Sequence, residues 1–196
     1  MFLKNNRYVN YLCFIIFLNF SYSVEANTKI KILDYLNSLK YFSASFIQND
    51  NVTLSEGRVY IGEKRVRAEY LSPSKILIIL DEDKAMYYNY DLEEDEFFNP
   101  KNTNAWFFYD IFRNPSFFEN SQISIINNEL ILKKMGIDNE GKNFTLRVLF
   151  EKSPLVLRAV EIIIEDSFLR LSIYNHSYDQ DFDSGLFKLI SPKLLN

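Results

Sequence analysis

Residues 42–73 read FSASFIQNDNVTLSEGRVYIGEKRVRAEYLSP, and most of this stretch alternates apolar with polar side chains. In its first segment, Phe42, Ala44 and Phe46 share one face, with serines between them. In its last segment, Ala68 and Tyr70 point one way, while the residues between and before them are charged. A period of two over this length is typical of antiparallel strands with one face in water and the other enclosed. The stretch leaves open whether the protein fills the enclosed side or a guest occupies it.

Similar patterns continue along the chain. Apolar residues at spacings of three and four predict helices over 28–40 and 104–113. The acidic run from Asp91 to Glu96 is predicted to be a solvated loop. Strands are predicted over residues 42–49, 54–61, 65–71, 75–80, 85–90, 122–126, 129–134, 143–151, 156–165 and 168–175, with one more short strand between Phe182 and Pro192.

The order of these elements predicts a mainly β fold of the α+β type. Strands and helices do not alternate as βαβ units, so a parallel sheet is not expected. A single strongly curved antiparallel sheet, an incomplete barrel of about ten to eleven strands, fits the pattern best. The two apolar helices need a surface to cover, and the open mouth of the barrel is the natural place. Without repeats, linkers or breaks in composition, residues 27–196 are expected to form one domain.

The N-terminus indicates an exported protein. Lys4 and Arg7 precede an apolar run from Tyr11 to Phe20, which has the length of a signal-peptide core and is short for a bilayer span. Small residues follow, and Val24-Glu25-Ala26 offers a cleavage site. Residues 1–26 are therefore predicted to be an export signal. The alternative is an uncleaved membrane anchor.

Composition limits the chemistry that the chain can perform. The only cysteine, Cys13, precedes the cleavage site, so the mature chain is expected to lack disulfides and a lipid-modified cysteine. The formal net charge of −4 provides no field that attracts nucleic acid. About 170 residues remain after the signal, which suffices for a sizeable core.

Catalytic and metal-binding motifs are not apparent. The single histidine, His176, is predicted to lie in a solvent-exposed loop. Asp179, Asp181 and Asp183 have the alternate spacing of a calcium loop, but the glycine comes one residue late and Ile190 stands at the twelfth position. No nucleophile turn or phosphate loop occurs. We therefore expect no catalytic residues, no metal and no cofactor.

An aromatic-rich, half-open β container suits an apolar ligand, because each methylene moved out of water contributes about 0.8 kcal/mol. The alternative is that the same side chains pack on one another. The face assignment of each strand is the weak step, since a slip of one residue inverts it. The candidate residues of the concave wall are Phe46, Val59, Ile61, Val66, Ala68, Tyr70, Ile76, Ile78, Met86 and Tyr88, covered by Leu33 and Leu36 from the first helix and by Trp106, Phe107 and Ile111 from the second.

A series of motifs resembles the LolA family, the periplasmic carriers of outer-membrane lipoproteins. Phe42-Ser43-Ala44-Ser45-Phe46-Ile47-Gln48 follows the first helix, like the family's Phe-x-x-x-Phe-x-Gln. The order and spacing of the series cover most of the chain after residue 27. The other matching segments are residues 57–61, 67–73, 75–81, 86–90 and 187–192.

The resemblance implies a helical lid over a hydrophobic cavity in an unclosed barrel. It implies a monomeric carrier that accepts acylated lipoproteins from an inner-membrane ABC transporter and passes them to an outer-membrane receptor or membrane. Family members carry a basic residue followed by proline that latches the lid; here residues 62–65 contain no proline, so Arg65 or Arg67 is the candidate latch. Ala68 stands where the family has a bulky aromatic residue, which implies a larger or reshaped cavity. The second reading is an exported lipid-binding or envelope-sensing module of the same fold without lipoprotein transfer.

Overall fold

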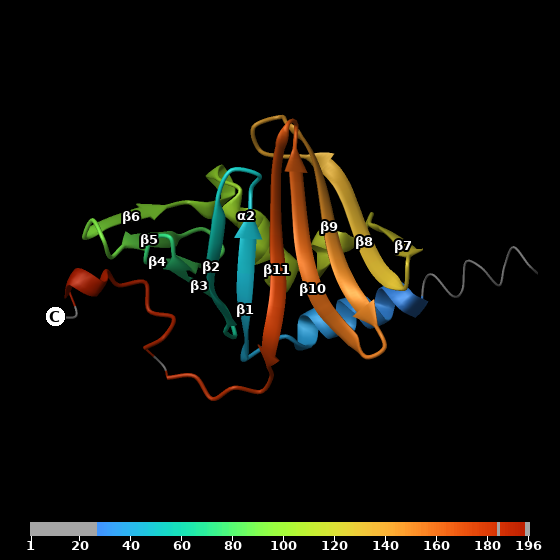
Figure 1. The fold of residues 1–196 in the computed structure, drawn as a ribbon, viewed down its shortest axis with the longest axis horizontal. Helices are drawn as coiled ribbons and strands as arrows, with labels where there is room; N and C mark the ends of the chain where they lie inside the picture. The colour runs from blue at the N-terminus through green and yellow to red at the C-terminus, as the bar shows by residue number, and fades with distance from the viewer. Residues whose placement is uncertain (1–26, 184, 195–196) are drawn as a thin grey trace, which may run out of the picture.

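The computed structural model describes residues 27–183 and 185–194, so the predicted export signal and Cys13 lie outside the described residues. Within them, eleven strands form one antiparallel sheet in the order β6-β5-β4-β3-β2-β1-β11-β10-β9-β8-β7 (Figure 1). The strands are β1 (Phe42–Asn49), β2 (Leu54–Ile61), β3 (Val66–Ser72), β4 (Ile76–Leu80), β5 (Ala85–Asn89), β6 (Glu94–Phe98), β7 (Gln122–Ile126), β8 (Glu129–Ile137), β9 (Asn143–Lys152), β10 (Leu155–Ile164) and β11 (Ser167–Ser177).

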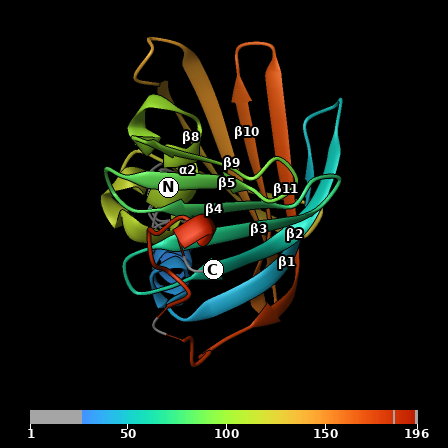
Figure 2. The ribbon, with the colours of Figure 1, turned by 90° about the vertical axis from the view of Figure 1, so that its left-hand side faces the viewer.

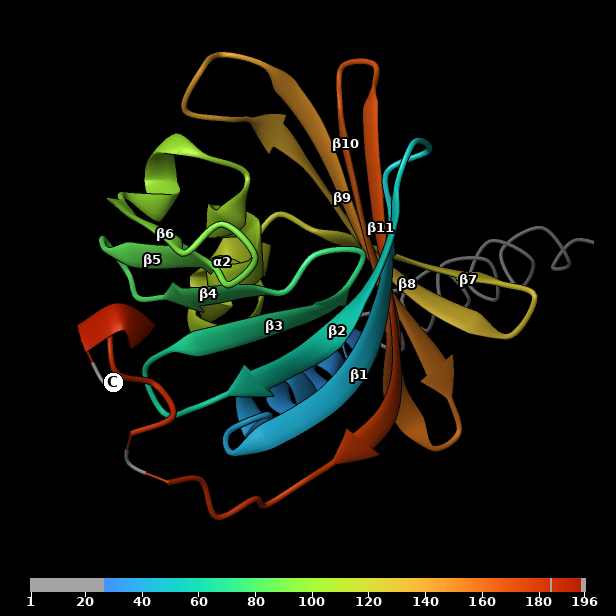
Figure 3. The same cartoon turned by 60° about the vertical axis from the view of Figure 1, so that its left-hand side comes forward.

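The sheet consists of two meanders joined by one long-range pairing. Strands β1–β6 form one half and β7–β11 the other, and β1 pairs with β11 through contacts such as Phe46↔Ile173. The edge strands β6 and β7 are connected by the segment that carries helix α2 (Ala105–Arg113). The sheet curves strongly, and both helices lie inside the curve (Figures 2 and 3). The predicted incomplete antiparallel barrel, with helices across its open side, is confirmed.

The two helices bury one apolar face each. Residues 27–38 are helical, and Ile32 and Leu36 on this segment are 0% and 2% exposed. In α2, Phe107 and Ile111 stand four residues apart and are also buried, as expected for one face of a helix. The helix ends at Arg113, since Asn114 precedes a proline and leaves helical geometry. Among the described residues, no helix is long and apolar enough to cross a membrane.

Three short 3₁₀ segments also occur in the part of the chain that the structure describes. They are η1 (Pro100–Asn102), η2 (Pro115–Phe118) and η3 (Pro192–Leu194). Segments η1 and η2 flank α2, so prolines bracket the helix that crosses the open side of the barrel.

Two sequence predictions of structure are wrong. The acidic run from Asp91 to Glu96 overlaps β6, in which Glu96 pairs with Tyr87 of β5. The three acidic side chains of this edge strand are exposed to water, so carboxylates do not prevent ladder formation. The tail from Phe182 to Pro192 forms no strand among its described residues; residues 185–187 form a turn, and the carbonyl oxygens of Leu186 and Phe187 accept hydrogen bonds from arginine side chains.

His176 also differs from its prediction. It lies in β11 and is half-buried, with its Nε2 atom 2.7 Å from the carbonyl oxygen of Leu157. The register of β9 and β10 shifts between Leu157 and Ala159, which leaves ladder groups that side chains satisfy. His176 is therefore part of the packing at this bulge.

Candidate functional site

The concave face of β1–β4 carries the predicted wall. The register places Ala44, Val59, Ala68 and Ile78 opposite one another on successive strands, hence on one face. Ile76 lies opposite Tyr70 on this face. The predicted wall residues found in the main core, or packed against it, are Phe46, Val59, Ile61, Val66, Ala68, Tyr70 and Ile78.

The placement of Met86 and Tyr88 on this wall is wrong. They lie opposite Ile79 and Leu77 in β4, on the convex face of the sheet. These four side chains form a separate buried cluster, against which Leu189 from the C-terminal tail packs. The residue of β5 opposite Ile78 is Tyr87, so the predicted face was inverted by one position.

The predicted helical residues do face the concave wall. Leu36, Phe107 and Ile111 are buried in the main core, and Leu33 and Trp106 pack against it half-buried. The sequence prediction missed the contribution of the second half of the sheet, whose strands were predicted without an assignment of faces. Its core residues include Leu132, Phe144, Leu146, Val148, Phe150, Leu157, Val160, Ile162, Leu171 and Ile173.

Among the described residues, several side chains beneath the helices pack closely. Ile61 and Phe107 have no exposed surface, and Phe46 is 1% exposed. The ring of Phe107 packs edge-on against Phe144 at 4.9 Å and stacks on Trp106 at 3.9 Å, measured between centroids. A guest that enters this space has to displace the helical side chains first.

The half-buried residues Ala68, Tyr70 and Ile78 mark the loosest part of this wall. The hydroxyl of Tyr70 donates a hydrogen bond to Oε1 of Gln48 at 2.8 Å, and its ring meets that of Phe46 edge-on at 5.1 Å. Burial raises the pKa of Tyr70 to about 12. The phenol therefore stays neutral at physiological pH, as an apolar site requires.

A few polar contacts attach the helices. Nη2 of Arg113 donates to the carbonyl oxygen of Leu39 at 3.1 Å. Nζ of Lys29 donates to the carbonyl oxygens of Glu119 and Ser121 at 2.7 and 3.1 Å. The N–H of Leu157 donates to the Tyr35 hydroxyl at 3.1 Å, which ties the first helix to the β10 bulge.

Arg113 is the basic residue that joins the two helices, and the sequence prediction missed it. Its Nε atom is buried and has no hydrogen-bond partner among the described residues. Burial lowers the pKa of Arg113, although the guanidinium remains charged at physiological pH. A single arginine at the end of a helix resembles an ordinary helix-terminal cation, so the sequence carried no signal for this role.

The predicted latch residues bond elsewhere, which corrects that prediction. Nη1 of Arg65 donates to the carbonyl oxygen of Phe187 at 2.9 Å, and Nη1 of Arg67 donates to that of Leu186 at 2.7 Å. Arg65 also pairs with Asp81, its Nε lying 2.6 Å from the Asp81 Oδ2. Both arginines project from the convex face because they alternate with the inward-facing Val66. They fasten the C-terminal tail, which runs beside β2–β5 in Figure 1.

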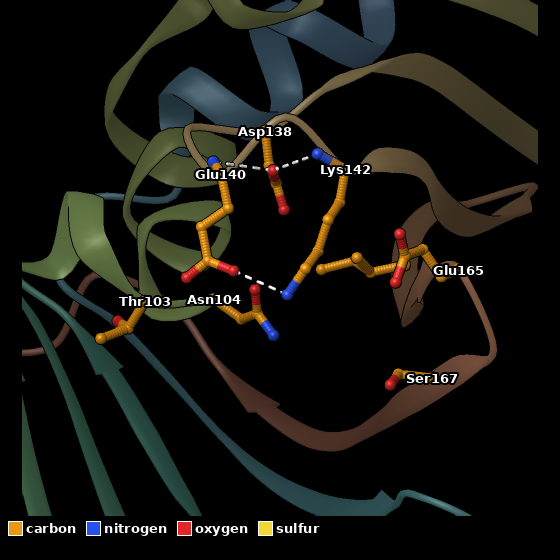
Figure 4. Close-up of a pocket in the computed structure, with 8 residues that line it drawn as sticks. Thr103, Asn104, Asp138, Glu140, Lys142, Glu165 and Ser167 are labelled. Atoms are coloured by element: carbon orange, nitrogen blue, oxygen red, sulfur yellow. Dashed lines mark hydrogen bonds and ion pairs between the residues drawn. The ribbon is translucent and has the colours of Figure 1, made fainter.

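A polar depression of about 360 Å³ lies beside the start of α2 (Figure 4). Three of its charged side chains bond to one another or to nearby backbone: Nζ of Lys142 lies 2.7 Å from Oε2 of Glu140, and Asp138 accepts the backbone N–H groups of both residues. Among the described residues, no group of acids, histidines or cysteines is arranged to hold a metal ion. Its lining residues are Thr103, Asn104, Asp138, Glu140, Lys142, Ile164, Glu165 and Ser167.

Comparison with known proteins gives matches in structure alone. No family model matches the sequence. No curated protein matches it either. An uncharacterized conserved protein from Thermus thermophilus has a similar structure, with a TM-score of 0.53 at 12% identity over 85% of this chain and 95% of that chain.

MucB also shares the fold, with a TM-score of 0.51 at 8% identity over 85% of this chain and 63% of the MucB chain. The complex of MucA and MucB from Pseudomonas aeruginosa matches with a TM-score of 0.48 at 9% identity, over 84% of this chain and 61% of that chain. At these identities the likeness shows the fold alone.

Proposed function

We propose that this chain is a carrier of acylated proteins, which holds their acyl chains in the concave interior between the sheet and the two helices. The observation that carries the proposal is the construction of that interior. Both halves of the sheet and both helices line it with apolar side chains, from Phe46 and Ile61 to Phe107 and Phe150. The Tyr70 phenol on this wall is neutral and already hydrogen-bonded.

The helices are the part of this core that can move. Neither of them belongs to the sheet ladder, so lifting them breaks no strand pairing. Lifting the helices exposes the apolar surface that they bury and breaks the few polar contacts of Lys29, Tyr35 and Arg113. An acyl chain of ordinary length contributes roughly 10 kcal/mol on transfer out of water, before ordering costs. A guest can therefore replace the helices as the partner of the concave wall.

The direction of transport follows from the resemblance to the LolA family. The carrier would receive lipoproteins from an inner-membrane ABC transporter, shield their acyl chains across the periplasm and pass them to an outer-membrane receptor or membrane. Export would depend on the signal predicted at residues 1–26. Binding must be reversible at each transfer, so successive sites need only modest differences in affinity. The carrier needs no cofactor and performs no catalysis.

The second candidate is an exported lipid-binding or envelope-sensing module that does not transfer lipoproteins. It draws on the fold shared with MucB at a TM-score of 0.51. The two candidates use the same concave interior but differ in what happens to the cargo. A sensor retains or reports its ligand, whereas a carrier extracts it from one membrane and releases it to another.

Release of lipoproteins from spheroplasts tests the proposal. The purified protein is added to spheroplasts that retain labelled lipoproteins in their inner membrane, and a known carrier serves as positive control. A carrier produces a soluble complex that contains both proteins. If the known carrier releases lipoproteins and this protein does not, transport is excluded, and binding of free acyl lipids then decides whether the second candidate stands.

A further inference from the structure

A row of polar side chains borders the apolar wall of β1–β3. Gln48 of β1 follows the core residues Ala44 and Phe46 at alternate positions, so it shares their concave face. Its neighbours across the ladder are Ser55 of β2 on one side and the core residue Leu171 of β11 on the other. Gln48 is half-buried, and Ser55 is 9% exposed. The row next to Phe46 on the concave face can therefore form hydrogen bonds.

A glycine in β2 allows a tyrosine of β3 to reach Gln48. The register places Phe46, Gly57 and Tyr70 side by side on β1, β2 and β3. A Cβ atom on Gly57 would lie 2.4 Å from the Phe46 ring, so the missing side chain leaves room for the rings of Phe46 and Tyr70 to meet across β2. The Tyr70 hydroxyl then donates to Oε1 of Gln48 at 2.8 Å. This bond holds the Gln48 amide in one orientation.

The hydrogen bond from Tyr70 leaves the donor side of the Gln48 amide unused. A glutamine side chain carries one acceptor oxygen and two N–H donors. Among the described residues, neither Nε2 of Gln48 nor the hydroxyl of Ser55 has a hydrogen-bond partner, and neither atom is fully buried. In binding sites for small molecules, a few such polar groups on a mostly apolar surface fix the orientation of the ligand.

We propose that Gln48 binds the carbonyl oxygen of an acyl ester or amide, so that the hydrocarbon chain lies along the apolar wall and its carbonyl group lies at the row of Gln48 and Ser55. This subsite rests on the proposed function, which puts acyl chains in the concave interior. It adds the depth at which a chain is held, since the carbonyl stands at the linked end of the chain. Gln48, Ser55 and Tyr70 carry no charge, so the subsite suits a neutral carbonyl group better than the carboxylate of a free fatty acid.

Two lysophospholipids that differ by one carbonyl group test the subsite. Myristoyl lysophosphatidylcholine has an ester carbonyl, and its tetradecyl ether analogue has a methylene in that place. Each lipid is titrated into the protein below its critical micelle concentration and followed by calorimetry. The parent protein is expected to bind the ester about five-fold more tightly than the ether, the usual net effect of one hydrogen bond. Gln48→Met keeps the length of the side chain without its donors, and the ratio of the two affinities is expected to fall to about one.

Two further variants separate the donors of Gln48 from the packing around them. Tyr70→Phe removes the internal hydrogen bond but leaves those donors, so it is expected to change the affinities for ester and ether to a similar degree. Gln122→Met alters an exposed glutamine of β7 and is the matched control, with the affinity ratio of the parent.

Equal affinity of the parent protein for the two lipids would overturn the subsite. A preference for the ester that survives in Gln48→Met would also overturn it, as would a preference that Tyr70→Phe removes as completely as Gln48→Met does. These outcomes leave the proposed function standing, because the acyl chain still binds. Binding of neither lipid to the parent would contradict the proposed function and the subsite with it.

Discussion

Arg113, the last residue of α2, donates a hydrogen bond from Nη2 to the carbonyl oxygen of Leu39, which directly follows the first helix. The contact bridges 74 positions in the sequence and joins the two helices that cover the concave face. Nε of the same side chain is buried without a hydrogen-bond partner among the described residues. This contact between the helices therefore combines a favourable hydrogen bond with the unfavourable desolvation of Nε. The contact holds the helices together, but they separate more easily than they would if every polar atom of Arg113 were hydrogen-bonded.

Replacing Arg113 with Met is expected to loosen the helices without unfolding the sheet. The change removes the bond to Leu39 but also removes a desolvated cation, so the two effects on the free energy of unfolding oppose each other. Hydrogen exchange of the backbone amides in residues 27–38 is expected to speed up, while exchange in β10 stays unchanged. Arg58→Met, which alters an exposed arginine of β2, is the control. Equal exchange in the two variants would show that Arg113 does not hold the helices.

Phe46 and Tyr70 are expected to differ strongly in their effect on stability. Phe46 is 1% exposed, so Phe46→Ala should lower the free energy of unfolding by about 3–5 kcal/mol, the usual cost of emptying a packed aromatic site. Tyr70→Phe keeps the ring and loses only the bond to Gln48, which should cost about 1 kcal/mol. Urea unfolding followed by circular dichroism measures both variants. Similar losses in the two would mean that the interior beneath the helices is loosely packed.

The Arg65–Asp81 pair is expected to make stability depend on pH in the acid range. Partial burial alone would raise the pKa of Asp81, but hydrogen bonds from Arg65 and from the N–H of Glu82 lower it below its ordinary value. A lowered carboxyl pKa stabilises the folded state above the pKa of the unfolded chain, and this contribution disappears as the pH falls through the folded pKa. Asp81→Asn is therefore expected to be less stable than the parent at pH 7 and to lose this deficit in strong acid. A difference that stays constant from neutral to acid pH would contradict the role of the ion pair.

The carboxylate of Asp110 is expected to affect stability at neutral pH in the opposite direction, by lowering the free energy of unfolding. Burial in α2 raises the pKa of this carboxyl, and the Asn114 side chain only partly compensates. A carboxyl whose pKa is raised on folding destabilises the folded state once the pH exceeds its unfolded value. Asp110→Asn is therefore expected to increase the free energy of unfolding at pH 7 and to have less effect in strong acid. Urea unfolding at the two pH values measures this, and a variant less stable than the parent at pH 7 would show that the ionised carboxylate makes a favourable contact.

The sequence predicted the strands well where alternation was regular. Residues 42–49, 54–61 and 122–126 were predicted with the bounds that the structure shows. Strand β6 was missed because four consecutive acids, residues 93–96, resemble a loop, whereas the three of them that lie in this edge strand are exposed to water. The faces of Met86 and Tyr88 were inverted because β5 is apolar on both sides, one against the core and one against the tail.

The long-range contacts of the candidate site could not be predicted. The bonds from Arg65 and Arg67 to the tail span more than a hundred positions, and only the folded register brings them together. The alternation showed that one face was enclosed, but it could not show that side chains of both helices pack against that face. Such packing between segments is a property on which the pattern of a single strand carries no information.

Fluorescence of Trp106 tests most directly whether acyl chains enter the concave interior. Trp106 is the only tryptophan of the chain and lies half-buried against Phe107 and Phe144. Bromine quenches indole emission only near contact, so a brominated acyl chain titrated into the protein is expected to quench Trp106 saturably, and the matched unbrominated chain is expected to compete. Binding of the acyl chain measured by calorimetry without quenching of Trp106 would place the ligand elsewhere, and no binding at all would contradict the account of this interior as an acyl site.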